Sequence, residues 1–255
     1  MIEISIIGTG NVASHLAHAF LKCNGILLKQ ILGRTPKTLL PFKNLAECIT
    51  SYKDIQDVDI LIIAVSDNVI HEVSEAIPIT HSIVAHTSGS TSIDALKKHS
   101  KRAIFYPLQS FSKNRNIDFS TVPICLEAVN NSNLLLLEEV ASALSDSIHL
   151  LNSESRAHLH QAAVFANNFC NHILYQTEEI CKTHSLDFNL LKPLMTETVN
   201  KAFDIGAFAA QTGPAKRQDT STIKKQLENL KTEEQKLIYN TITQTILKTY
   251  GKEKL

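Results

Sequence analysis

The stretch ISIIGTGNVASHLAHAF, residues 4–20, restricts the fold of this chain more than any other part of the sequence. A short apolar run leads into the pattern Gly8-x-Gly10-x-x-Ala13, and the apolar residues that follow recur with helical periodicity. A dinucleotide-binding strand–turn–helix has this form: the first glycine makes the tight turn, the second lets the backbone approach a pyrophosphate, and the third small residue lets the helix pack closely. The alternative is a strand-to-helix turn with incidental glycines.

Before residue 152, short apolar runs alternate with helical patterns. The runs are apolar at nearly every position, as in strands that are covered on both faces of a parallel sheet. We expect six such strands, in residues 2–8, 26–33, 57–65, 81–87, 102–108 and 122–128. The sequence therefore predicts an α/β fold for residues 1–152, with a Rossmann-type doubly wound parallel sheet that binds a dinucleotide.

After residue 152 the strand pattern stops. No glycine or proline occurs between Pro123 and Pro193, and residues 153–184 have the pattern of one helix, roughly 45 Å long. Three further helical segments follow, around residues 188–208, 221–230 and 233–250. Residues 153–255 are therefore predicted to form an all-α domain for substrate binding and dimerisation.

The charge and cysteine content disfavour several classes of function. Lysine plus arginine and aspartate plus glutamate both number 25 in 255 residues, so no net charge attracts nucleic acid or a membrane surface. No apolar run approaches the ~20 residues of a membrane span, and no leader pattern precedes the first strand. The five cysteines lack the C-x-x-C spacing of a zinc or redox site. We expect a soluble, cytoplasmic protein with reduced thiols and no metal.

The end of the second predicted strand indicates which dinucleotide binds. NAD sites usually carry a carboxylate there, which accepts from the ribose 2′-hydroxyl, whereas a 2′-phosphate needs a cation and hydrogen-bond donors. The chain has Gly33, Arg34 and Thr35 at this point. Arg34 can pair with a phosphate and Thr35 can donate to it, so NADP is favoured over NAD. The alternative is that Arg34 is a solvated loop residue.

Two further loops follow predicted strands, at the sheet edge where α/β folds bind ligands. In the first, Val65 ends a strand and Ser66 lies beside a bound ribose; alternatively, Ser66 or Asp67 caps the next helix. The second is a polar turn after a buried strand and a candidate substrate ledge. Its residues are His86, Thr87, Ser88 and Gly89. A lone histidine such as His86 is more often structural than an acid or base.

The long predicted helix carries a polar stripe. His160 and Asn167 are seven residues apart and share one face, with Asn168 beside it. Small residues between them leave room for a ligand; they are Ala162, Ala163 and Ala166. A metal site formed by His158 and His160 is disfavoured, because residues two apart point to different sides of a helix.

Near the C-terminus, the segment TGPAKRQD presents two cations. Its Gly-Pro pair breaks one helix and Asp219 or Thr220 can cap the next, so the loop between them exposes Lys216 and Arg217. Either these cations bind a ligand or they are solvated charges on a capped turn, and the composition does not decide between the two.

Six segments, in this order, resemble one family. They are GTGNVA, AVSD, HTSGS, YPLQSFS, HQAAVFANN and TGPAKRQD. Together they look like the Rossmann-like proteins with a C-terminal domain of unknown function 2520, and the resemblance covers nearly the whole chain. Such proteins are commonly labelled NADP or deazaflavin-coenzyme oxidoreductases. They are similar in architecture to pyrroline-5-carboxylate reductases and 6-phosphogluconate-dehydrogenase-like enzymes, so the resemblance implies a fold and a cofactor more directly than a substrate.

The resemblance also implies roles for individual residues. Those expected to bind the cofactor are Gly8, Thr9, Gly10, Asn11, Val12, Arg34, Thr35, Val65, Ser66 and Thr87. The candidate catalytic residues are His86, Ser88, His160 and Asn168. The candidate substrate-binding residues are Tyr106, Asn167, Lys216 and Arg217.

Three departures from the family pattern bear on mechanism. Tyr106 stands where family members usually have His, Gln218 replaces the glycine of an Arg-Gly-Asp segment, and the lysine that β-hydroxyacid dehydrogenases carry four residues before an asparagine is missing. The remaining candidates for moving a proton are His160, His86 and Tyr106. An iminium is already protonated, so we expect reduction of a small C=N or C=O compound. The alternatives are a non-catalytic nucleotide-binding regulator and an oxidoreductase that uses the deazaflavin coenzyme.

Apolar residues spread beyond one stripe of the long helix. They are Phe165, Phe169, Ile173, Leu174 and Ile180. Such a helix needs a second partner, so we expect a two-fold homodimer formed through residues 153–255. In the resembling pyrroline-5-carboxylate reductases, paired helical domains complete the active site. The loop with Lys216 and Arg217 is therefore expected to reach the cofactor domain of the other chain and to hold an anionic substrate group.

Overall fold

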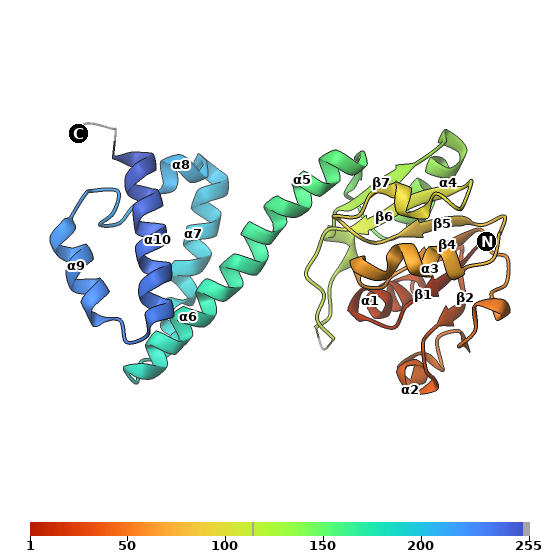
Figure 1. The fold of residues 1–255 in the computed structure, drawn as a ribbon, viewed down its shortest axis with the longest axis horizontal. Coiled ribbons are helices and arrows are strands. Elements are labelled where there is room, and N and C mark those ends of the chain that lie inside the picture. Colours follow the sequence, from red (N-terminus) through yellow and green to blue (C-terminus); the bar gives the residue numbers. More distant parts are fainter. Residues whose placement is uncertain (114, 252–255) are drawn as a thin grey trace. The chain divides into compact units, whose positions relative to one another are not determined.

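The computed structural model describes residues 1–113 and 115–251. They form two compact units, Met1–Asn167 and Asn168–Leu255, whose elements are labelled in Figure 1. The first unit holds the whole β-sheet and helix α5 (Ser153–Ala163), and the second consists of helices and their connections. The domain boundary expected at residue 152 coincides with the start of α5, whereas the compact units meet just beyond the end of that helix.

An eight-stranded sheet forms the centre of the first unit, in the spatial order β3-β2-β1-β4-β5-β6-β7-β8. The strands are β1 (Ile2–Ile7), β2 (Ile26–Leu32), β3 (Glu47–Ile49), β4 (Ile60–Ile63), β5 (Ile83–His86), β6 (Arg102–Pro107), β7 (Ile124–Ala128) and β8 (Ile148–Leu150). The order 3-2-1-4-5-6 is that of a dinucleotide-binding Rossmann sheet, with its switch point between β1 and β4. The six predicted strands are confirmed. Strands β3 and β8 were not predicted, because three residues are too few to give a pattern.

The direction of one strand differs from the expectation. All neighbouring strands are parallel except β6 and β7, which are antiparallel and pair from Ala103 with Ala128 to Pro107 with Ile124. The predicted parallel sheet is therefore confirmed for the other neighbouring pairs, and β6–β7 is the one antiparallel pair among the described strands. A parallel connection needs a crossover, usually a helix, and the described part of residues 108–123 contains only the short turn η5 (Phe119–Thr121).

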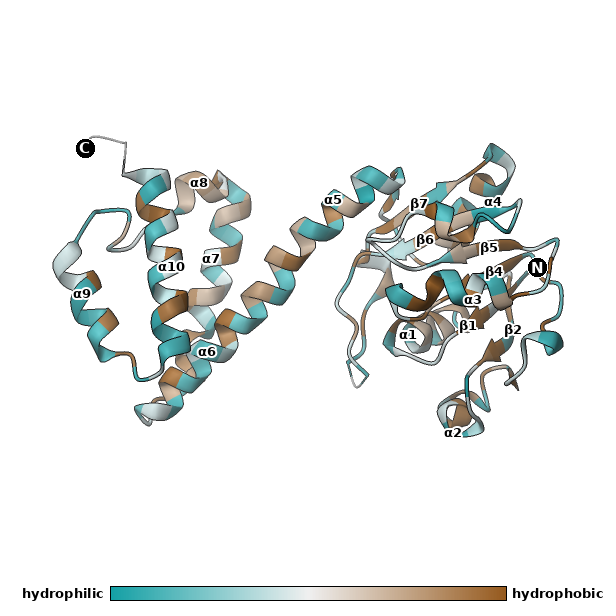
Figure 2. Ribbon diagram, in the orientation of Figure 1, coloured by the Kyte–Doolittle hydropathy of each residue, from teal (hydrophilic) through white to brown (hydrophobic). Residues whose placement is uncertain are grey.

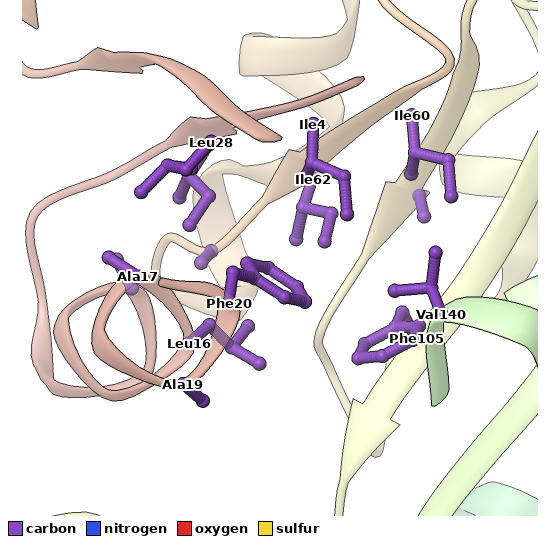
Figure 3. Packing of buried hydrophobic residues seen from close by; sticks show 14 of the residues in the cluster. Ile4, Leu16, Ala17, Ala19, Phe20, Leu28, Ile60, Ile62, Phe105 and Val140 are labelled. Atoms are coloured by element: carbon purple, nitrogen blue, oxygen red, sulfur yellow. The ribbon is translucent and has the colours of Figure 1, made fainter. Parts of the chain in front are cut away.

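Helices α1 (Asn11–Phe20) and α4 (Asn131–Ser142) pack on one face of the sheet. Figure 3 shows Leu16 and Phe20 of α1 and Val140 of α4 in the same cluster as Ile62 of β4 and Phe105 of β6. The rings of Phe20 and Phe105 lie 6.4 Å apart between centroids. Each fully buried side chain of this size stabilises the fold by about 1.5–3 kcal/mol, so this face anchors α1 and the turn that precedes it.

Alternate residues of the same strands face the other side. Ile7 of β1 and Leu61 and Ile63 of β4 form a second cluster with Ile70 of α3 (Ile70–Ala76). Apolar side chains on both faces explain why Figure 2 shows the central strands largely in brown. The remaining short elements of this unit are α2 (Pro36–Leu39), η1 (Leu40–Phe42), η2 (Tyr52–Asp54), η3 (Asp67–Val69) and η4 (Ile93–Leu96).

The second unit contains α6 (Cys170–Thr183), η7 (Phe188–Leu191), α7 (Lys192–Ile205), α8 (Ala207–Ala210), α9 (Thr220–Asn229) and α10 (Glu233–Tyr250). These elements confirm the helical segments predicted after residue 184. The long helix predicted over residues 153–184 is also confirmed, with one difference: the π-helical segment η6 (Val164–Phe169) joins α5 to α6. Within the described part of the chain, none of the helices has the length and apolar character that crossing a bilayer requires.

Candidate functional site

Gly8 makes the turn that follows β1. Its φ is +129°, which residues with a side chain rarely adopt, and a Cβ atom there would lie 2.1 Å from the Ala64 carbonyl oxygen. The Gly8 N–H donates to the Leu32 carbonyl at 2.9 Å. The ends of β1, β2 and β4 therefore meet at one edge of the sheet, and the close approach at Gly8 requires a glycine.

Gly10, in contrast to Gly8, has open space where a side chain would be. Apart from Gly10 itself and its chain neighbours, no heavy atom of the described residues lies within 4 Å of the place that a Cβ would occupy. Gly10 precedes α1 as its N-cap residue, and no described side chain caps this helix end. The first N–H groups of a helix lack intrahelical partners and attract anions. The open space at Gly10 and the uncapped helix terminus therefore fit the pyrophosphate of a dinucleotide.

The segment after β6 is bound to the first turns of α1. Asn11 Nδ2 donates to the Phe111 carbonyl at 3.0 Å, and His15 Nε2 lies 3.0 Å from the Ser112 carbonyl. The rings of His15 and Phe111 are 5.0 Å apart. The Asn11 side chain is therefore engaged with this segment, and any contact of Asn11 with pyrophosphate falls to its backbone N–H. Val12, the next residue of the helix, is half-buried.

The loop after β2 packs directly against the glycine loop. A Cβ at Gly33 would lie 2.8 Å from Thr9 Cγ2, so the absence of a side chain permits this approach. Arg34 and Thr35 follow and are exposed. The pKa of Tyr52, in η2, is raised by burial and by the Glu72 carboxylate, and the Arg34 guanidinium acts in the opposite direction. Arg34 is therefore an exposed cation just beyond the end of β2, at the same sheet edge as the glycine loop.

The residues after β4 lie at the same edge. The side chain of Ser66 makes no capping hydrogen bond to η3, and Asp67 Oδ2 instead accepts from Ser90 Oγ at 2.7 Å. Ser66 is thus the N-cap residue of η3 by position only, and no side-chain capping bond from Ser66 or Asp67 is formed to η3 or α3. Ser66 is exposed and Val65 half-buried, and Val65 Cγ1 would lie 3.4 Å from a Cβ at Gly8.

His86, the last residue of β5, is fully buried. Its Nδ1 accepts from the Ser88 N–H at 3.2 Å and its Nε2 lies 3.3 Å from the Ser92 carbonyl, so a neutral ring with its proton on Nε2 satisfies both contacts. Burial lowers the pKa of His86 to about 4, although the hydrogen bond to Ser92 acts in the opposite direction. At neutral pH the ring is uncharged and both of its nitrogens are engaged with the polar turn.

The hydroxyl of Ser88 is also used within the turn. Ser88 Oγ donates to Thr91 Oγ1 at 2.9 Å and accepts from the N–H groups of Ser90 and Thr91 at 3.2 and 3.0 Å. The Thr87 N–H donates to the Ile63 carbonyl at 3.2 Å, which aligns the ends of β4 and β5. The structure therefore places Thr87 and Ser88 at the predicted edge, with the Ser88 side chain turned to the loop itself.

Tyr106 of β6 and His160 of α5 form a hydrogen-bonded pair. Tyr106 Oη lies 3.0 Å from His160 Nδ1, and the two rings meet edge to face with their centroids 6.0 Å apart. A Cβ at Gly89 would lie 2.5 Å from His160 Nδ1 and 2.7 Å from Tyr106 Cζ, so the glycine lets the polar turn contact both rings. Burial raises the pKa of Tyr106 to about 12, and the phenol keeps its proton at neutral pH.

The other candidates lie on η6 and near α9. Asn167 and Asn168 are exposed residues of η6, and the boundary between the compact units falls between them. Lys216 Nζ is 5.1 Å from the ring centroid of Tyr250, a cation–π contact, while Arg217 is exposed. Gln218, which replaces the glycine of the family pattern, adopts φ +58°, a region that glycine enters more easily.

Asp219 is the N-cap residue of α9. Asp219 Oδ1 accepts from the Thr222 N–H at 3.1 Å, which confirms one of the two caps predicted for α9. Among residues 1–113 and 115–251, no group of three or more His, Cys, Asp or Glu side chains is arranged to hold a metal ion.

Two family models match the chain. Residues 3–97 match the NADP oxidoreductase, coenzyme F420-dependent family, and residues 122–246 match domain of unknown function 2520. A solved structure from Bacteroides fragilis, described as an NADP oxidoreductase, is 30% identical, with 97% of this chain and 98% of that chain covered and a TM-score of 0.87. The chain belongs to the NADP oxidoreductase-like family that carries domain of unknown function 2520. No curated protein sequence matches the chain.

More distant structures share the fold of the family. An imine reductase from Myxococcus stipitatus in complex with NADP+ is 15% identical, with 98% of this chain and 96% of that chain covered and a TM-score of 0.70. Plasmodium falciparum pyrroline carboxylate reductase with NADP bound is 14% identical, with 98% and 94% covered and a TM-score of 0.62. The fold and the family predicted from the sequence are therefore confirmed.

Residues that the sequence did not single out join the site in the structure. Arg156, one helical turn before His160, is buried and ion-paired with Glu127 of β7. The four-residue spacing of Arg156 and His160 indicates that they share one face of a helix, but nothing in the sequence indicates that Glu127 is the partner of Arg156. The sequence predicts Gly89 only as part of a polar turn, because its close packing against two rings arises from the tertiary structure.

Proposed function

We propose that the protein is an NADPH-dependent reductase of a small C=N or C=O compound. The observation that carries the proposal is the Tyr106–His160 pair, a protonated phenol bonded to an imidazole at the C-terminal end of β6. Family membership supports the oxidoreductase class. The fold shared with an imine reductase and a pyrroline carboxylate reductase supports a C=N substrate.

The residues that would hold the cofactor lie along one sheet edge. The N–H groups of the glycine loop, residues 8–12, would bind the pyrophosphate, and Arg34 and Thr35 would bind the 2′-phosphate. Val65, Ser66 and Thr87 continue this edge towards the Tyr106–His160 pair. Bound there, NADPH supplies a hydride. The chain itself positions the substrate and provides a proton.

Reduction of a C=N or C=O bond places a hydride on carbon and a proton on nitrogen or oxygen. Tyr106 keeps its proton at neutral pH, because burial raises its pKa to about 12, and it can donate that proton to the substrate heteroatom. In its Nδ1–H form, His160 donates to the Tyr106 oxygen at 3.0 Å and passes this proton to the phenolate, while the half-exposed imidazole takes up a proton from solvent at Nε2. An iminium carries its proton already, so for such a substrate the pair acts in positioning alone.

The remaining candidates have supporting roles in this proposal. The amides of Asn167 and Asn168 and the cations Lys216 and Arg217 bind polar and anionic parts of the substrate. His86 and Ser88 are engaged in hydrogen bonds of the polar turn, which supports a role in shaping it. Anionic substrates would benefit most from the two cations, since charge-assisted contacts are stronger than neutral ones.

The test compares wild type with Tyr106→Phe in NADPH oxidation, using the cyclic imine 2-methyl-1-pyrroline and a small ketone. For the ketone, loss of the proton donor should lower kcat about 10²–10⁴-fold with the Kd for NADPH unchanged. For the imine the loss should be much smaller at low pH, where the iminium form dominates. Equal activity of the two proteins on the ketone would contradict the role of Tyr106.

Cofactor preference is tested separately by titration calorimetry. Wild type should bind NADPH more tightly than NADH, and Arg34→Ala should weaken NADPH binding by about 1.5–3 kcal/mol with little effect on NADH. The deazaflavin coenzyme is the second candidate, because the family that residues 3–97 match is named for it. Tight binding of that coenzyme together with weak binding of NADPH would favour the second candidate.

A further inference from the structure

The guanidinium of Arg156 is fully buried where three segments of the first unit meet. It pairs with the Glu127 carboxylate and donates through Nη2 to the Thr91 carbonyl at 2.5 Å and to Ser153 Oγ at 3.2 Å. Ser153 Oγ donates to Glu127 Oε2 at 2.8 Å and accepts from the Ile93 N–H at 3.0 Å. We call Arg156, Glu127 and Ser153 the arginine clamp. The clamp joins the start of α5 to β7 and to the segment after the polar turn.

Stability alone is a poor explanation for this clamp. The side chain of Arg156 is 0% exposed and that of Glu127 is 17% exposed, and Arg156 Nε has no hydrogen-bond partner among the described residues. Removing an ion pair and an N–H group from water carries a free-energy cost that their attraction only partly offsets. Apolar side chains of similar volume often stabilise a core at least as well. The buried ion pair is therefore better explained by a need to hold the surrounding segments in a fixed arrangement.

The clamp borders the Tyr106–His160 pair on both sides. Arg156 and His160 are four residues apart, so they project from the same face of α5. Through Thr91, Arg156 also holds the segment that follows the polar turn, and Gly89 of the turn packs against the rings of His160 and Tyr106. Any shift of α5 or of the turn would change the 3.0 Å separation of His160 Nδ1 and Tyr106 Oη.

We propose that Arg156 is a positioning residue, which fixes His160 and Tyr106 in their hydrogen-bonded geometry by tying α5 to the polar turn. The inference rests on the proposed function for its catalytic consequence, but the geometry can be measured without a substrate. Burial raises the pKa of Tyr106, Cys125 and Asp67 raise it further, and the charge of Arg156 opposes them. Loss of a proton by the phenol is eased by this cation.

The test uses the double variant Arg156→Met/Glu127→Leu, which removes both charges and leaves no buried carboxylate unpaired. Arg156→Met alone would leave Glu127 without its cation and could fail to fold. Histidine ¹⁵N–¹H correlation spectra, assigned with His160→Gln, report the hydrogen bond at His160 Nδ1. We expect the double variant to keep its melting temperature within a few degrees and its Kd for NADPH, and to lose the hydrogen-bonded His160 signal seen in wild type. An unchanged signal would overturn the proposal.

Kinetics with 2-methyl-1-pyrroline and the small ketone give the second readout. Misplacement of a catalytic group by about 1 Å can cost 10²-fold, so kcat for the ketone should fall roughly 10–100-fold with little change in KM. Arg102→Gln is the matched control, because Arg102 lies on β6, pairs with Asp94 at 3.6 Å and stands outside the clamp. This variant should keep wild-type spectra and rates. If wild type reduced neither compound, the proposed function would fail, while the spectra would still decide the role of Arg156.

Discussion

Two glycines of the first loop are glycine for different reasons. Gly8 is needed by the fold, because its φ of +129° and its contact with the Ala64 carbonyl leave no room for a side chain. Gly10 has φ −78° and open space around it, so the fold makes no demand there. The demand at Gly10 must come from outside the chain, and backbone approach to a pyrophosphate supplies it. A substitution at Gly8 should therefore affect stability, and a substitution at Gly10 should affect binding.

Gly10→Val should abolish NADPH binding and leave the fold intact, since the new side chain fills the space over the helix N-terminus without touching the protein. Gly8→Ala is the contrasting variant and should lower the free energy of unfolding by several kcal/mol or prevent folding. Calorimetric titration and urea unfolding measure the two effects. Wild-type affinity in folded Gly10→Val would show that the loop is only a turn.

His86, in the polar turn, makes the stability of the fold depend on pH. Its ring is buried and neutral, with one nitrogen facing the Ser88 N–H and the other the Ser92 carbonyl. The pKa of a histidine in the unfolded chain is about 6.5, whereas burial lowers that of His86 to about 4 in the folded protein. Between these values the unfolded state binds a proton that the native state does not, so stability is full above pH 6.5 and falls as the pH drops towards 4.

The contribution of His86 to the free energy of unfolding should therefore decrease by about 3 kcal/mol between pH 7 and pH 4. Urea titrations at intervals across this range measure it, as the difference in pH dependence between wild type and His86→Gln. His158→Gln, at an exposed position of α5, is the control and should follow wild type. Parallel pH curves for wild type and His86→Gln would contradict a neutral buried ring.

At the scale of elements, the sequence predicts those helices and strands that depend on the local order of apolar and polar residues. The six longer strands and the long helix follow from runs of apolar residues and from the lack of breakers. The reversed direction of β7 goes with a connection from β6 whose described residues contain no crossover helix, and three-residue strands form only because a neighbour pairs with them. The Tyr106–His160 contact joins residues 54 positions apart, a separation at which spacing carries no information about proximity.

The π-helical segment η6 alters one predicted stripe. His160 and Asn167 were placed on one face by the 3.6-residue period of an α-helix. A π-helix closes its hydrogen bonds from i to i+5 and so takes about one more residue per turn. Position i+8 then replaces i+7 in line with His160, which brings Asn168 into the stripe and rotates Asn167 away. Segments of this kind are frequent at functional sites.

We accordingly expect Asn168→Ala to lower kcat/KM for 2-methyl-1-pyrroline about 3–10-fold, the effect of losing one ordinary hydrogen bond. Asn167→Ala is the matched control, one residue away and equally exposed, and it should stay close to wild type. Steady-state rates with NADPH measure both. A larger loss in Asn167→Ala than in Asn168→Ala would show that the α-helical stripe, rather than the π-helical one, faces the substrate.

At the scale of the molecule, the helical unit exposes many apolar side chains. Helix α7 has no buried residue, and Leu194, Val199 and Phe203 on it are 60%, 52% and 88% exposed. Exposed apolar residues in such number are typical of an association surface. Homo-oligomers with a two-fold axis are the commonest way to cover one. We propose a homodimer formed mainly through the helices after residue 152, with α7 as part of the interface.

Light scattering at micromolar concentration should give twice the chain mass of 28.3 kDa. Phe203→Glu should shift the mass towards one chain, because a charge cannot be buried unpaired, while Lys224→Glu, an exposed position of α9, should not. If Arg217 of one chain completes the site of the other, co-expression of Arg217→Ala and Gly10→Val chains should restore about a quarter of wild-type activity, since half of the dimers are mixed and each has one intact site. No recovery in confirmed mixed dimers would place Arg217 and Gly10 in the site of the same chain.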